Sequence, residues 1–151
     1  MRLFGHPIHP ILIHFPTALL PMELLFSFLH RIYNYEAYWI AAFYCLVVGV
    51  FAGLAAILTG LVDLTSISKD NKPAIATALY HGFLNGGIIL IYGIVLYKAW
   101  QLFPDPDIPG PGALIFRAAL IILLFGGNYL GGALIYKYHV GINKRDSNAN
   151  N

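Results

Sequence analysis

The sequence predicts an all-α membrane protein, a bundle of four antiparallel transmembrane helices with both termini in the cytoplasm. Of its 151 residues, 58% are hydrophobic and only 11% are charged, whereas a soluble domain has about 25% charged residues. Four apolar segments exceed the roughly 20 residues that a helix needs to cross a bilayer. They cover residues 10–33, 38–62, 74–102 and 112–138. We therefore expect one transmembrane domain, residues 1–142, followed by a disordered polar tail, residues 143–151.

The first segment opens with the most distinctive motif of the chain. Residues 5–16 read Gly-His-Pro-Ile-His-Pro-Ile-Leu-Ile-His-Phe-Pro. Proline suits a first helical turn, where its missing N–H would have no partner, so the helix could begin near Pro10 or again at Pro16. His14 then enters the membrane at shallow depth. No small-residue cleavage site follows, so we expect this segment to remain in the mature protein.

The second and third segments each bring one candidate to the same side of the membrane. Asp63 ends the second segment and could orient an imidazole, bind a cation or simply end the helix. On the third segment His81 and Asn85 share a helix face at four-residue spacing. Helices one and three of such a bundle are diagonal, so His14 and His81 could both point at the central axis.

The fourth segment follows a Pro/Gly-rich connector at residues 104–112 and ends near His139. The third and fourth helices contain several glycines, which leave the backbone without side chains. This indicates either close helix packing or room for a flat macrocycle. These glycines are Gly82, Gly86, Gly87, Gly126, Gly127, Gly131 and Gly132.

Five of the six histidines thus gather at one side of the membrane: His6, His9, His14, His81 and His139. Burying an ionisable group near hydrocarbon is energetically unfavourable, so such groups usually have a function. Two imidazoles from opposite helices are what an axially ligated haem needs, so we predict a haem b held by His14 and His81, with His9 and Asn85 beside it. A metal site of His6, His9, Asp63 and His139 is the alternative, although the spacing matches no compact metal motif.

Two polar residues lie deeper in the apolar segments. Glu23 and Asn128 stand in the middle of the first and fourth segments, and we expect Glu23 to be protonated there. The two could share an interhelical hydrogen bond, or Glu23 could relay protons. His30, at the opposite end of the first helix, is expected to be an interfacial residue without a partner.

The distribution of charge sets the orientation and excludes several functions. Six cations fall on the side of the termini, namely Arg2, Lys69, Lys72, Lys137, Lys144 and Arg145, and three on the other, namely Arg31, Lys98 and Arg117. The excess predicts cytoplasmic termini. A net charge of +2 gives no case for nucleic acid. No catalytic triad or phosphate loop is present, so we do not expect an enzyme on its own.

Several motifs together resemble DUF2231, a bacterial inner-membrane family of unknown function. They are the opening at residues 5–16, Thr-Gly-x-x-Asp at 59–63, His-x-x-x-Asn at 81–85 and the glycine-rich close at 131–141. The resemblance marks His9, His14, Asp63, His81 and Asn85 as motif positions, and His139 departs from the pattern. Members also resemble the membrane part of proteins fused to a Rieske iron–sulfur domain, which implies a respiratory or photosynthetic redox complex.

Two functions follow as alternatives. The chain could be a multi-pass b-type cytochrome subunit of the bacterial inner membrane, transferring electrons within such a complex. Because a single haem lies near one membrane face, a partner subunit would then have to carry a second centre. The chain could instead be a non-catalytic accessory subunit, surrounded by lipid and by other membrane subunits, with its histidines at interface contacts.

Overall fold

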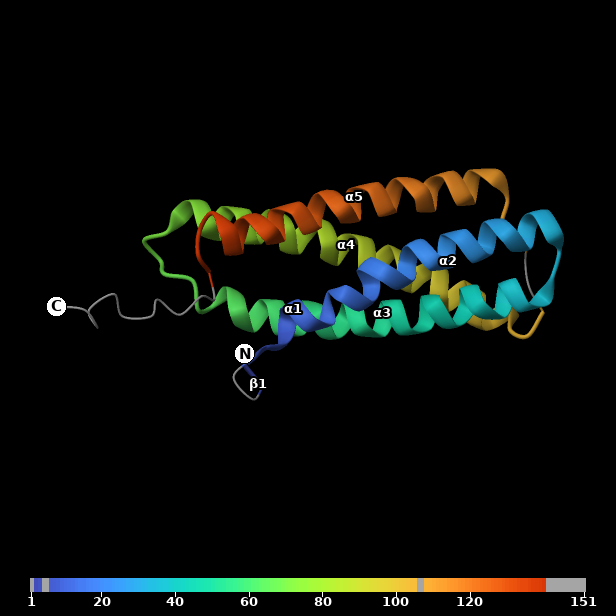
Figure 1. Ribbon diagram of the computed structural model, residues 1–151, viewed down its shortest axis with the longest axis horizontal. Helices are drawn as coiled ribbons and strands as arrows, with labels where there is room; N and C mark the ends of the chain where they lie inside the picture. Colours follow the sequence, from blue (N-terminus) through green and yellow to red (C-terminus); the bar gives the residue numbers. More distant parts are fainter. Residues whose placement is uncertain (1, 4–5, 106–107, 141–151) are drawn as a thin grey trace, which may run out of the picture.

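The computed structural model describes residues 2–3, 6–105 and 108–140 and shows a helical-bundle membrane protein with one short hairpin at its start (Figure 1). Helix α1 (Ile8–Leu12) runs almost directly into α2 (His14–Tyr33), and α3 (Glu36–Leu64), α4 (Lys72–Leu102) and α5 (Pro111–Tyr136) follow. Counted as one span, α1 and α2 join the other three as four helices long and apolar enough to cross a membrane. The predicted all-α transmembrane fold is confirmed. The tail at residues 143–151 lies outside the described residues.

A short hairpin precedes the helices. Strand β1 (Arg2–Leu3) pairs antiparallel with β2 (His6–Pro7). The residue before a proline favours extended backbone, and His6 precedes Pro7. The sequence pattern of long apolar runs gave no sign of this pairing.

The break between α1 and α2 follows from Pro16. Proline has no N–H to donate to the carbonyl four residues back, which here belongs to Leu12. The neighbouring carbonyl of Ile13 accepts two hydrogen bonds from Thr17, one from its backbone nitrogen (3.2 Å) and one from its hydroxyl (2.7 Å). The helix therefore starts at Ile8 and restarts at His14, close to both predicted beginnings.

The helices form a closed bundle. Helices α2 and α4 each pack against both α3 and α5, and α1 packs against α3. The loops between consecutive helices lie at alternating ends of the bundle (Figure 1). Helices α2 and α4 are consequently diagonal, as the sequence predicted for the first and third spans.

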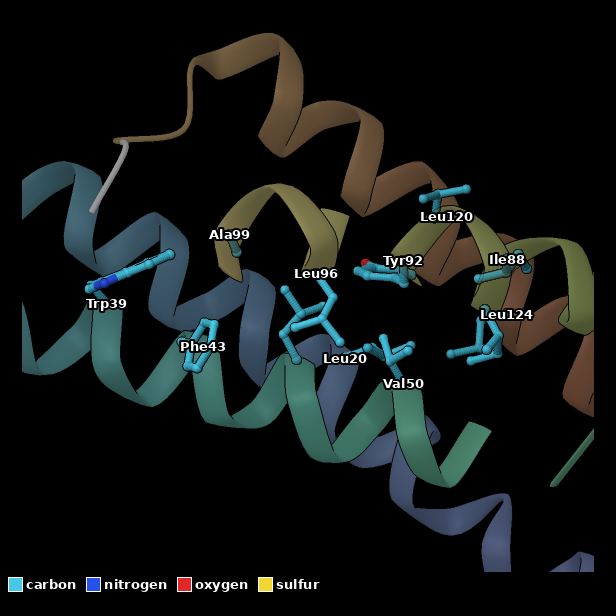
Figure 2. Packing of buried hydrophobic residues seen from close by; sticks show 12 residues of the cluster. Leu20, Trp39, Phe43, Val50, Ile88, Tyr92, Leu96, Ala99, Leu120 and Leu124 are labelled. Atoms are coloured by element: carbon cyan, nitrogen blue, oxygen red, sulfur yellow. The ribbon is translucent and has the colours of Figure 1, made fainter. Parts of the chain in front are cut away.

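The apolar core fills the middle of the bundle with side chains from α2 to α5 (Figure 2). Leu20 and Tyr92 are fully buried within it. A Cβ on Gly53 would stand 2.5 Å from the end of the Ile89 side chain, so glycine there lets α4 approach α3. Large apolar side chains such as Phe83 and Tyr129 point outward, as a lipid-facing surface requires.

Candidate functional site

Two imidazoles meet at one end of the bundle. The rings of His9 in α1 and His81 in α4 lie with their centroids 6.1 Å apart and their planes at 89°. His81 is buried and His9 is half-buried. We call these two residues the imidazole pair.

His9 is fixed against α3. Its Nδ1 donates to the carbonyl of Ala56 over 2.9 Å, and the hydroxyl of Thr59 lies 3.5 Å from the same nitrogen. A Cβ on Gly60 would stand 3.0 Å from the His9 ring, so glycine admits the ring to this position. Because a carbonyl only accepts, Nδ1 carries the proton and Nε2 keeps its lone pair.

His81 is fixed against α5 in the same way. Its Nδ1 donates to the carbonyl of Gly127 over 2.8 Å, and the side-chain amide of Asn85 lies 3.0 Å from that nitrogen. A nitrogen that donates cannot also accept from an amide N–H. The oxygen and nitrogen of an asparagine amide are assigned from their hydrogen bonds. As assigned, the oxygen of Asn85 is buried without a partner among the described residues. Exchanging the two atoms puts this oxygen beside the N–H of His81. His81 then donates to two oxygens from Nδ1, and its Nε2 keeps the lone pair.

Glycines on α5 make room for this arrangement. A Cβ on Gly131 would stand 2.8 Å from the His81 ring, and a Cβ on Gly127 would overlap the Asn85 amide. Of the glycines that the sequence offered as the floor of a macrocycle, these two pack directly against the imidazole and its amide partner. Five others have no atom closer than 4.0 Å to where their Cβ would stand: Gly82, Gly86, Gly87, Gly126 and Gly132.

His14 is not part of this pair. Its side chain is exposed, and its Nδ1 donates to the carbonyl of Pro10 over 2.5 Å. Within the described chain no hydrogen bond or ring contact joins His14 to His81, the two residues predicted as axial ligands. Five residues of helix amount to a rotation of about 140°, so His9 and His14 face different ways. The structure thus brings His81, Asn85 and His9 together and leaves His14 outside.

The residues of the alternative metal site are dispersed. Asp63 lies one turn beyond Thr59 on α3, near enough for its charge to act on His9. His139 is exposed beyond the end of α5 with a left-handed φ of 53°. The main chain of His6 belongs to β2, and its side chain lies outside the described part of the structure. Across the described residues, no three His, Cys, Asp or Glu side chains gather as a metal-binding group.

The deeper polar residues have other partners than expected. Glu23 forms an ion pair with Arg117 of α5, which the sequence had placed among the cations of the far side. Asn128 donates instead to the hydroxyl of Thr17 over 3.0 Å. The predicted hydrogen bond between Glu23 and Asn128 is therefore wrong, because each finds a nearer partner on the facing helix.

His30 is also different from the prediction. It is buried, not interfacial, and its Nδ1 donates to the carbonyl of Tyr35 over 3.1 Å. Its ring lies 6.5 Å from that of Trp39. The α2–α3 turn folds back over the end of α2, and no apolar pattern along α2 could indicate that.

A model of a protein family described as a predicted membrane protein matches residues 5–144. The match includes all four spans and both residues of the imidazole pair. No curated protein and no solved structure matches the chain.

Proposed function

Since the chain belongs to the DUF2231 family of predicted membrane proteins, we propose that it is an integral membrane redox subunit in which His9 and His81 hold the iron of a b-type haem. The proposal keeps the cofactor expected from the sequence and replaces His14 by His9 as one of its two ligands. It rests on one observation, the imidazole pair, in which both rings are anchored through Nδ1 and approach each other at the same end of the bundle.

The donor set fits an iron that two neutral imidazoles would hold. Histidines that bind metals almost always donate their other ring N–H to a carbonyl, carboxylate or water, which fixes the tautomer and the ring orientation. Ala56 and Gly127 supply such carbonyls here. His9 and His81 would hold the iron through Nε2, the ring nitrogen that neither ring uses for its anchoring hydrogen bond.

The open positions next to the pair do not lie between the two rings: Gly82, which follows His81, is exposed at the surface of the bundle, and Gly132 is half-buried. A haem bound to the pair would supply one-electron transfer. The chain itself orients the imidazoles through the two carbonyls, and Asn85 holds the tautomer of His81.

The setting of the proposal is the bacterial inner membrane, with the termini and the imidazole pair toward the cytoplasm. The pair lies at one end of the bundle, so electrons that cross the membrane need a second centre near the other face. We therefore place the chain in a respiratory or photosynthetic complex in which another subunit carries that centre.

An absorption spectrum tests the proposal. The full chain, purified from haem-sufficient cells, should show a Soret band and the reduced-minus-oxidised bands of a b-type cytochrome. His9→Ala and His81→Ala should each remove these bands, whereas His14→Ala, the matched control five residues from His9, should keep them. Helicity measured by circular dichroism checks that each variant is folded.

Two outcomes contradict the proposal. A wild-type protein without a Soret band leaves an accessory subunit as the better function. Loss of the bands in His14→Ala, with the bands kept in His9→Ala, restores His14 as the ligand and rejects the imidazole pair.

A further inference from the structure

A line of buried polar groups runs along α2 from the α2–α3 end of the bundle towards its middle. Glu23, Ser27 and His30 of α2 are 1%, 3% and 2% exposed. Their spacing of four and three residues places them on one face of the helix, over two turns. No lipid can satisfy such groups, so each polar atom of this line needs a partner inside the protein.

The inner part of the line is well paired. Ser27 donates from its hydroxyl to Oε1 of Glu23 over 2.8 Å. Arg117 of α5 donates to that same oxygen over 2.5 Å and to the Ser27 hydroxyl over 3.1 Å. Tyr92 of α4 and Cys45 of α3 lie near enough to interact electrostatically with the carboxylate of Glu23. Each helix from α2 to α5 therefore contributes a group to the surroundings of this carboxylate.

Three buried polar atoms along or beside the line are not paired in the described part of the chain. Within the described residues Oε2 of Glu23, Nε2 of His30 and Nε1 of Trp39 are buried and have no hydrogen-bond partner. The Nδ1 of His30 already donates to Tyr35, so Nε2 can accept, whereas the indole N–H of Trp39 can only donate. Their rings are 6.5 Å apart. Buried polar groups of this kind are commonly satisfied by water, and a water between the two rings would accept from Trp39 and donate to His30.

We propose that this line is a proton-entry route, which leads from the α2–α3 end of the bundle through His30, bound water and Ser27 to Glu23. A proton taken up at Nε2 of His30 passes through the water to the hydroxyl oxygen of Ser27. The hydroxyl gives its own proton to Oε1 of Glu23. His30 returns to its neutral form, the carboxylate becomes a carboxylic acid, and Arg117 keeps its charge without a counter-charge. No electron moves in this step, and the route does not depend on haem.

Infrared spectroscopy after a drop in pH tests the route in the full chain in detergent. We expect the carbonyl stretch of a buried carboxylic acid to appear, and Glu23→Gln to remove it. His30→Gln keeps a polar side chain but cannot carry a proton, so the same band should appear at least about a hundredfold more slowly. His14→Gln, at the exposed histidine of the other end, should keep the wild-type rate.

The outcomes separate this route from the redox proposal. His9→Ala should leave the Glu23 band unchanged even where it removes a haem spectrum. If Glu23→Gln removes no band, Glu23 takes up no proton and the route is wrong. If His30→Gln and a second variant, His30→Phe, both respond at the wild-type rate, protons do not enter through His30. Circular dichroism of each variant confirms that a slow response is not unfolding.

Discussion

Arg117 of α5 donates to the carboxylate of Glu23 of α2 over 2.5 Å inside the transmembrane bundle. The side chain of Glu23 is 2% exposed and that of Arg117 is 16% exposed. Two charges removed from water are stable only when they are paired and hydrogen-bonded, and Ser27 completes the arrangement by contacting both. The pair joins the first and last spans across 94 positions of sequence.

Replacing Arg117 alone should therefore destabilise the fold far more than replacing Glu23 and Arg117 together. We expect Arg117→Leu to lower the free energy of unfolding by about 3–5 kcal/mol, because a buried carboxylate is left without its partner. The double variant Glu23→Leu/Arg117→Leu should recover most of that loss. Denaturant unfolding in detergent, followed by circular dichroism, measures both. Arg31→Leu, at an exposed arginine of the same end, should cost less than about 1 kcal/mol, and equal losses in the two arginine variants would contradict the prediction.

The hydrogen bond between Asn128 and Thr17 should be worth much less than the ion pair. Interhelical hydrogen bonds in membrane proteins contribute about 0.6 kcal/mol on average. A double-mutant cycle of Asn128→Leu and Thr17→Val should yield a coupling energy of that order. A coupling energy as large as that between Glu23 and Arg117 would contradict the prediction that the hydrogen bond stabilises the fold less than the ion pair.

Neighbouring glycines on α5 offer a matched test of the packing around His81. Gly127→Ala would push a methyl group into the Asn85 amide, whereas Gly126→Ala meets no atom within 4 Å. Overpacking of this kind costs about 1–3 kcal/mol. We expect a clear drop in the midpoint of thermal unfolding for Gly127→Ala and none for Gly126→Ala. Equal midpoints would mean that α4 and α5 can move apart at no cost.

The spans were predictable because hydrophobic length is a local property of the sequence. The exact ends of the helices were harder to predict. Helix α4 begins at Lys72 because the Asn71 side chain accepts a hydrogen bond from the backbone nitrogen of Ala74 over 3.2 Å. Hydropathy does not record such a cap, and the predicted segment began only at residue 74.

The candidate site was predictable in place but not in detail. Helix order alone put the histidines of the first and third spans at one end of the bundle. That His9 and not His14 lies beside His81 depends on the phase of a helix interrupted near Pro16 and on the contact of α1 with α3. The role of Arg117 depends on a partner 94 positions away, which no local pattern could reveal.

The sidedness of the protein is the last prediction, and the ion pair strengthens it. With Arg117 inside the bundle, only Arg31 and Lys98 remain as cations at the end that carries the α2–α3 and α4–α5 loops. The opposite end carries Lys69 and Lys72 between α3 and α4, besides Arg2 in β1 and Lys137 just after α5. Loops rich in lysine and arginine stay in the cytoplasm. A reporter fused after residue 143 should therefore be cytoplasmic, and one inserted at residues 108–110 should be periplasmic. A periplasmic reporter at residue 143 would move the imidazole pair to the outer face, and the proton-entry route would then open from the cytoplasm.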